Sequence, residues 1–168
     1  MSCLDKKQPL RFRLIQLERL LSRLKPETRI LMKIELTTNP TQSDIDEIRS
    51  GLRNYNTPYL ENVFHSDVVC FTKDINGAKI GGLVGEIWGN WLIIKYLWVS
   101  PGHKGQGLGS QLLLEAENFA KTKGCHSCFL DTFSFQAKPF YIKHGYQLQF
   151  TLEQYPENSE RHYFTKHL

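Results

Sequence analysis

The stretch HKGQGLGSQLL, residues 103–113, places glycine at three alternate positions and then becomes leucine-rich. The segment before it, WLIIKYLWV (91–99), predicts a strand. The segment after it predicts a helix to Lys123, with an apolar side formed by Leu112, Leu113, Ala116, Phe119 and Ala120. Free N–H groups in the first turn of such a helix suit phosphate oxygens. A glycine turn that binds no ligand is the alternative.

Two common phosphate-binding loops do not match this spacing. The Walker A loop requires Gly-Lys-Ser/Thr at the start of the helix, and the dinucleotide-binding fingerprint requires G-x-G-x-x-G. Here Gly105, Gly107 and Gly109 form G-x-G-x-G, and Lys104 precedes them. Both motifs are therefore excluded.

The rest of the chain predicts a mixed α/β sheet. We expect a strand at MKIEL (32–36), then a helix over 41–56 with Ser43 as its N-cap, and a short helix over 58–64. Ile45, Ile48 and Leu52 would share one face of the longer helix. Three antiparallel strands are then expected at 67–74, 79–88 and 91–99, because Asn76-Gly77 and Gly89-Asn90 are hairpin turns. After the long helix follow a strand, a short helix ending at Gly145 and two final strands, at 125–133, 137–145, 146–155 and 161–168.

The size and composition predict a globular protein of the cytoplasm. The chain has 168 residues, and 40% of them are hydrophobic, which is enough to bury one sizeable core. The sequence has no apolar run long enough to span a membrane and no export signal at its start. Four irregularly spaced cysteines suit a reducing compartment. Cys125 and Cys128 have C-x-x-C spacing, but we expect them to be buried strand residues and expect no metal.

The N-terminal residues 1–31 predict a separate basic helix, with a leucine every three or four positions from Leu10 to Leu24. This segment holds 8 Lys and Arg against 3 Asp and Glu, whereas residues 32–168 hold 13 against 14. The helix could pack on the domain or on a partner subunit, lie on a membrane surface, or be an extension before a natural start at Met32. The near-neutral remainder does not predict nucleic-acid binding, although an adaptor built on the basic helix is an alternative.

The segment LWVSPGHKGQGLGSQLL resembles the acyl-CoA pyrophosphate loop of the GNAT superfamily of N-acetyltransferases, whose pattern is Arg/Gln-x-x-Gly-x-Gly/Ala. Lys104, Gly107 and Gly109 take those places, and a lysine stands where the pattern has arginine or glutamine. The segment FLDTFSFQAKPFYIKHGYQL is similar to the strand, short helix and FYxKxGF ending of the family. The resemblance covers residues 32–168 and leaves 1–31 unexplained, so two domains with that boundary are expected.

The resemblance implies a mainly antiparallel central sheet with flanking helices, in which the strands 91–99 and 125–133 splay into a V. It also implies direct transfer of an acetyl group from acetyl-CoA to a primary amine of a small molecule or peptide, and a homodimer at the level of the family. The donor would lie along one set of residues: Leu97, Trp98, Val99, Lys104, Gly105, Gln106, Gly107, Leu108, Gly109 and Ser110. A backbone N–H near Leu97 or Trp98 would polarise the thioester carbonyl. A non-catalytic acyl-CoA-binding sensor or regulatory module is the alternative function.

Tyr141 matches the tyrosine of the family's FY helix and is the candidate general acid, since a phenol is protonated at neutral pH. A purely packed Phe–Tyr pair is the alternative. Many family members carry a glutamate on the strand before the loop, but here that stretch is Ile93, Ile94 and Lys95. Glu86 on the preceding strand is the first substitute as base, with Asp131 second and a water relay equally plausible. A solvated strand carboxylate is the other interpretation of Glu86.

Four aromatic residues surround one hairpin: Trp88, Trp91, Tyr96 and Trp98. Packing in the core is the default expectation for them, and an amine-binding wall acting through cation–π contact is the alternative. His103 and His144 are expected to be a loop residue and a helix-end residue rather than catalysts.

Overall fold

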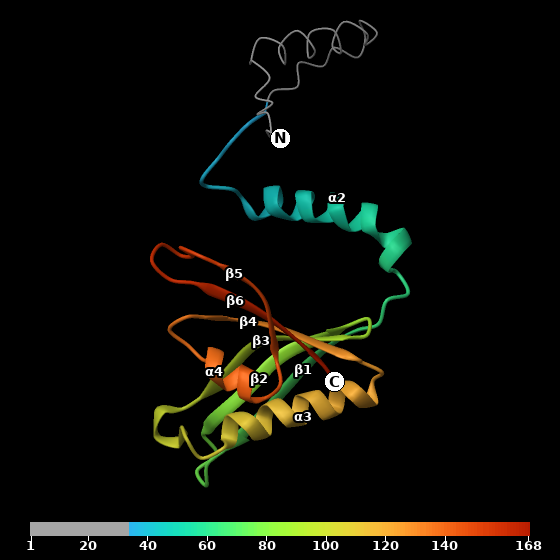
Figure 1. Ribbon diagram of the computed structural model, residues 1–168. Helices are drawn as coiled ribbons and strands as arrows, with labels where there is room; N and C mark the ends of the chain where they lie inside the picture. The colour runs from blue at the N-terminus through green and yellow to red at the C-terminus, as the bar shows by residue number, and fades with distance from the viewer. Residues whose placement is uncertain (1–33) are drawn as a thin grey trace, which may run out of the picture. The chain divides into compact units, whose positions relative to one another are not determined.

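The computed structural model describes residues 34–168 (Figure 1). The chain divides into two compact units, Met1–Tyr55 and Asn56–Leu168. The predicted basic helix in residues 1–31 and the domain boundary after it lie outside the described residues and stay predictions.

The expected strand over 32–36 is wrong for its described part. Ile34, Glu35 and Leu36 have no regular secondary structure, and both apolar side chains are exposed. The sheet order has no strand from this segment. A short apolar run forms a strand only when a neighbouring strand supplies its hydrogen bonds. The residue pattern alone was therefore not sufficient to predict a strand here.

Helix α2, Gln42–Leu60, replaces the two helices expected over 41–56 and 58–64. Its start is capped by Thr41 rather than by Ser43. The Thr41 hydroxyl accepts from the Asp44 N–H at 3.2 Å, and the Asp44 carboxylate accepts from the Thr41 N–H at 2.7 Å, which forms a reciprocal capping box. The helix continues through Pro58 for two more residues, because a proline in the last turn removes only one backbone hydrogen bond.

A six-stranded mixed sheet forms the second unit, with the order β1-β2-β3-β4-β6-β5. Only the β3–β4 pair is parallel, and every other neighbouring pair is antiparallel. The strands are β1 His65–Lys73, β2 Lys79–Trp88, β3 Trp91–Val99, β4 Ser127–Phe133, β5 Gln147–Leu152 and β6 Arg161–His167. The predicted fold class, a mainly antiparallel α/β sheet, is therefore confirmed.

The hairpins follow the predicted turns. Gly77 and Gly89 have φ angles of 85° and 60°, values that glycine adopts without strain. Strands β2 and β3 therefore have the predicted bounds, and β1 begins two residues earlier than predicted, at His65.

Helix α3, Leu108–Thr122, covers one face of the sheet over β1, β2 and β3 (Figure 1). Leu112, Leu113, Ala116 and Ala120 are buried as predicted, but Phe119 is exposed, and the Lys123 ammonium lies 5.3 Å from its ring centroid. The four buried residues follow one another at spacings of one, three and four positions and form one stripe along the helix. Phe119 lies at the edge of this stripe.

The sequence pattern did not reveal that the same helix buries a carboxylate. Glu117 accepts a hydrogen bond from the Tyr146 hydroxyl at 2.9 Å and pairs with the Lys166 ammonium at 2.6 Å. Glu117 is only 3% exposed. Through Lys166, Glu117 connects α3 to β6, and through Tyr146 it connects α3 to the segment after the short helix α4, Lys138–Lys143. None of the helices among residues 34–168 combines the length and apolarity needed to cross a bilayer.

Candidate functional site

The parallel strands β3 and β4 separate beyond Ile94, whose partner Leu130 ends the ladder between them. A bulge at Lys95 interrupts β3 at the same point, because Val84 pairs with Tyr96 while Gly85 pairs with Ile94. Gly85 is required there, since an added Cβ would lie 2.5 Å from the Ile93 carbonyl oxygen. A bulge bends its strand and increases the local twist. The residues after Lys95 therefore leave β4, which confirms the expected V.

The opened edge of β3 presents unpaired backbone groups. The Ser100 N–H donates to the Ile80 carbonyl in the direction of β2. Successive residues of a strand direct their N–H and C=O groups to opposite sides. The N–H groups of Val99 and Leu97 therefore point into the gap, and that of Trp98 points to β2. From the sequence, the N–H groups of Leu97 and Trp98 are both candidate donors to the thioester carbonyl. Of these two, only the N–H of Leu97 points into the gap.

A cleft occupies this gap in two adjoining halves. The loop half has a volume of about 470 Å³ and lies against the glycine loop and α4, and the strand half has about 560 Å³ and lies between β3 and β4. Both halves are lined by the same five residues, Leu97, Val99, Lys104, Ala137 and Tyr141. The two halves thus meet along these five residues, of which Tyr141 is one.

Most of the predicted donor-binding residues line this cleft. The loop half contains Leu97, Val99, Lys104, Gly105, Gly107, Leu108, Gly109 and Ser110, and the strand half adds Trp98. Gln106 lines neither half, and its side-chain amide donates to the Gly102 carbonyl at 3.2 Å. His103 and Lys143 also line the loop half. They were not predicted, although Lys143 is the lysine of the FYIKHG segment.

The glycine loop brings backbone N–H groups to the cleft. Gly105 and Gly107 have φ angles of 77° and 79°, in the left-handed region that L side chains disfavour. Gly107 caps α3, and the first intrahelical bond runs from the Gln111 N–H to the Gly107 carbonyl. The N–H groups of Leu108, Gly109 and Ser110 therefore have no acceptor within the helix. With Lys104 beside them, they form a site for an anion.

Helix α4 packs directly on this loop. A Cβ added at Gly109 would touch the Phe140 ring at 3.6 Å. One turn further, His144 Nδ1 lies 2.8 Å from the Phe140 carbonyl and Nε2 lies 2.9 Å from the Ser110 hydroxyl. The carbonyl can only accept, so Nδ1 carries a proton, and in the neutral tautomer with that proton Nε2 accepts from the Ser110 hydroxyl. His144 is thus the helix-end residue that was expected, and it holds the loop against α4.

Tyr141 lies at the junction of the two halves and is mostly buried. Burial, and secondly the charge of Asp131, raise the pKa of its phenol to about 12. The hydroxyl therefore stays protonated at neutral pH. The ring packs edge-on against Phe140, with 5.2 Å between the centroids. Tyr141 therefore forms a packed pair with Phe140 and also lines the cleft.

Asp131 lines the strand half, where it is the only carboxylate among the described lining residues. Its Oδ2 accepts from Arg161 Nε at 2.6 Å. The Arg161 guanidinium lies between 5.4 and 5.7 Å from the ring centroids of Phe133, Tyr155 and Tyr163. These rings fix the guanidinium, and the guanidinium in turn fixes the carboxylate.

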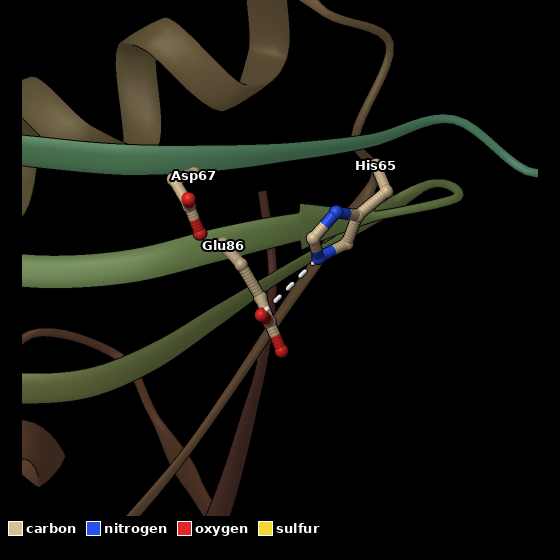
Figure 2. A group of neighbouring side chains, drawn as sticks. All are labelled: His65, Asp67 and Glu86. Carbon is tan, nitrogen blue, oxygen red and sulfur yellow. Dashed lines mark hydrogen bonds and ion pairs between the residues drawn. The ribbon is translucent and has the colours of Figure 1, made fainter. Parts of the chain in front are cut away.

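Glu86 lies elsewhere, on β2 beside His65 and Asp67 of β1 (Figure 2). It is not among the described residues that line either half of the cleft. Its carboxylate pairs with the Lys95 ammonium and accepts from His65 Nε2 at 3.3 Å. The Lys95 hydrogen bond is the largest cause that lowers the Glu86 pKa, and His65 adds to it. Glu86 pairs in register with Ile93, four residues before Leu97, which is about 13 Å along a strand.

The ligand atoms of His65, Asp67 and Glu86 lie within 4.8 Å of one another, a spacing at which three residues could hold a metal ion. The Lys95 ammonium already contacts the Glu86 oxygen that His65 approaches. Because the Lys95 ammonium already lies where a metal ion would bind, these residues form a cluster of ion pairs. Cys125 and Cys128 are buried as expected, but only Cys128 lies in a strand, because β4 begins at Ser127. Burial raises the pKa of both thiols, that of Cys128 to about 12, so both are expected to be unreactive.

The expectation that the hairpin aromatic residues pack in the core is wrong. Trp88, Trp91, Tyr96 and Trp98 are all exposed, because they alternate with the buried residues of β2 and β3 and so lie on the face opposite α3. Tyr96 and Trp98 line the strand half of the cleft.

Three comparisons agree with this architecture. The model of the acetyltransferase (GNAT) family matches residues 30–146. Blasticidin-S acetyltransferase of Streptomyces morookaense is 40% identical over 93 residues, which are 55% of this chain and 68% of that protein. The crystal structure of an acetyltransferase from Bacillus cereus ATCC 14579 has a TM-score of 0.73 and 36% identity, over 80% of this chain and 98% of that one.

A GNAT family acetyltransferase from Elizabethkingia anophelis, solved with acetyl-CoA bound, shares the fold with a TM-score of 0.51 at 21% identity. The alignment covers 80% of this chain and 95% of that one. From the family match, the relatives and the cleft in the V of the sheet, it follows that this chain belongs to the GNAT family of acetyltransferases and is an acetyl-CoA-dependent acyltransferase.

Proposed function

We propose that this protein transfers the acetyl group of acetyl-CoA to a primary amine by direct attack of the amine. The proposal is supported by three kinds of group that line one cleft. The free N–H of Leu97 and the protonated hydroxyl of Tyr141 belong to residues that both halves share, and the N–H groups of the glycine loop line the loop half. An acyl donor with a pyrophosphate needs this combination, because one part must bind anionic oxygens and another must act on a thioester.

The residues of the loop half fit the donor. The N–H groups of Leu108, Gly109 and Ser110 would bind its pyrophosphate, together with the Lys104 and Lys143 ammonium groups. The opened edge of β3 would pair with the amides of the pantetheine arm through Leu97 and Val99. When bound, acetyl-CoA supplies a thioester whose carbonyl carbon is the site of attack.

Each step of the transfer uses a group in the cleft. The Leu97 N–H would stabilise the oxygen that gains negative charge as the amine forms its bond to carbon. Tyr141 would donate a proton to the sulfur as the carbon–sulfur bond breaks. An acceptor that binds as an ammonium loses two protons overall. One of these returns to Tyr141, and the other is released to solvent.

A carboxylate is proposed to receive the proton that the ammonium loses before the attack and to release it to solvent. The contacts support Asp131 for this role. Asp131 lines the same half of the cleft as Tyr141. Glu86, the first candidate from the sequence, is outside this lining and is paired with Lys95 and His65. The contacts with Lys95 and His65 lower the pKa of Glu86. Because Asp131 is itself paired with Arg161, its place in the cleft is what distinguishes it from Glu86.

The acceptor is proposed to be a small-molecule amine. The relative from Streptomyces is named for blasticidin S, so this antibiotic belongs in the first set of acceptors to be tested. Other amines in the set should include polyamines, aminoglycosides, amino acids and a peptide N-terminus.

Release of free thiol from acetyl-CoA in the presence of each amine tests the proposal, with mass spectrometry of the acetylated product. We expect at least one amine to be acetylated, with thiol and product formed in equal amounts. If the protein binds acetyl-CoA but acetylates none of them, the alternative of a non-catalytic acyl-CoA-binding module takes the place of the enzyme.

A further inference from the structure

The strand half of the cleft has exposed aromatic walls on both sides. Tyr96 and Trp98 of β3 are 70% and 52% exposed, and Phe135, which follows β4, is 68% exposed. All three line the same half of the cleft. Burial of such rings stabilises a fold, so three aromatic side chains that face a cleft are available to a ligand instead.

Phe135 is the last ring of an ordered stack. Its ring lies 5.2 Å from that of Phe133, with 6° between the planes, and the Phe133 ring lies 6.3 Å from that of Tyr155 with 0° between the planes. The stack therefore runs through three parallel rings and ends in the cleft. Because one face of Phe135 is covered by Phe133 while most of its side chain is exposed, its other face can receive a further flat ring.

A carboxylate fixed by an ion pair with Arg161, that of Asp131, lies in the same half, which Lys95 and Lys104 also line. Asp131 and Phe133 occupy alternate positions of β4 and so lie on the same face of the sheet. Arg161 holds Oδ2 of Asp131 at 2.6 Å, and no other hydrogen bond to this carboxylate forms among residues 34–168. Oδ1 is thus available to a cationic group that enters beside the rings.

We propose that the acceptor is an ammonium-bearing molecule with a flat aromatic or heteroaromatic ring, in which Phe135, Tyr96 and Trp98 bind the ring and Asp131 binds the ammonium group. This inference rests on the proposed acetyl transfer and adds the chemical class of the acceptor. Stacking on Phe135 selects for planarity, since a saturated ring is puckered and has no π face. Asp131 selects for positive charge and places the nitrogen in the half of the cleft that Tyr141 shares.

A matched pair of amines separates ring planarity from size. 2-Phenylethylamine and 2-cyclohexylethylamine have the same carbon skeleton and the same ammonium group, and they differ in the flatness of the ring. At saturating acetyl-CoA we expect kcat/KM for thiol release to be about fivefold higher for the aromatic amine, the preference that one aromatic pair supplies. Titration of the protein saturated with CoA should give the same order of affinities.

Variants assign the preference to the stack. Phe135→Leu should bring the ratio of the two kcat/KM values close to one, and Phe119→Leu, which changes an exposed ring on α3 outside the cleft, should retain the ratio. Asp131→Asn should weaken the binding of both amines by about tenfold, because it removes a charge that both use.

Equal kcat/KM values for the two amines in the unaltered protein would overturn the proposed acceptor class while leaving acetyl transfer intact. Failure of both amines to bind the CoA-saturated protein would overturn it as well. Failure of the proposed function has a different signature, because the protein would then bind no acetyl-CoA or release thiol with no amine of any class.

Discussion

A hydrogen bond of 2.9 Å between the Ser110 hydroxyl and Nε2 of His144 joins the first turn of α3 to the end of α4. Ser110 lines the loop half of the cleft, and His144 is itself anchored through Nδ1 on the Phe140 carbonyl. The orientation of the loop therefore depends on a residue that lies outside the glycine motif.

His144→Phe tests this dependence. The substitution retains a ring beside Phe140, whose centroid lies 4.3 Å away, but removes both hydrogen bonds. One hydrogen bond is worth about 1 kcal/mol, so we expect acetyl-CoA to bind about fivefold more weakly in a calorimetric titration. Ser110→Ala should show a similar loss, and the double variant should lose less than the sum of both. Wild-type affinity in His144→Phe would remove this residue from the binding of the donor.

Tyr141→Phe should lower kcat by about a hundredfold or more, because it removes the proton donor for the thiolate. The affinity for acetyl-CoA should stay unchanged, since the ring still fills its place. The Tyr141 pKa is raised to about 12, so the hydroxyl remains a donor below that pH. A pH profile of kcat should therefore show no alkaline decrease due to Tyr141 up to about pH 11. An unchanged kcat in the variant would show that another group protonates the thiolate.

Asp131→Asn and Glu86→Gln distinguish the two carboxylates. We expect Asp131→Asn to lower kcat/KM for the amine by about a hundredfold, because it removes the proposed base from the cleft. Glu86→Gln should change kcat/KM by less than about threefold and lower stability by less than about 1 kcal/mol, as for other exposed ion pairs. Steady-state kinetics with one amine, together with urea unfolding, would test both expectations. The reverse order of effects on kcat/KM would restore Glu86 as the base.

Glu117→Ala tests the buried carboxylate of α3. The variant leaves the Tyr146 hydroxyl and the Lys166 ammonium without their partner, which should lower the free energy of unfolding by about 3 kcal/mol. Glu115→Ala, on the exposed side of the same helix, should cost less than about 0.5 kcal/mol. Urea unfolding of the two variants measures the difference, and equal losses would contradict the role given to Glu117.

The parts of the fold that the sequence predicted are those set by local chemistry. Gly77 and Gly89 fix the hairpins through their positive φ angles, and the bounds of β2 and β3 follow from them. The glycine loop was predictable for the same reason, since Gly105 and Gly107 adopt conformations that other residues disfavour.

The parts that the sequence did not predict depend on tertiary contacts. The burial of Glu117 becomes favourable only when Tyr146 and Lys166 approach it from distant segments. The pairing of Glu86 with Lys95 joins two strands beside the bulge in β3, and Gly85 is the one local signal of that bulge. The place of Asp131 in the cleft depends on where β3 and β4 diverge, and that point is a property of the sheet.

Binding of acetyl-CoA in the cleft at the glycine loop underlies every role proposed above. It can be measured by calorimetric titration of the purified protein with acetyl-CoA, and separately with ATP and NAD. We expect one acetyl-CoA to bind per chain with micromolar affinity, and ATP and NAD to bind much more weakly. If acetyl-CoA does not bind, or if all three bind with equal affinity, the assignment of the cleft is wrong.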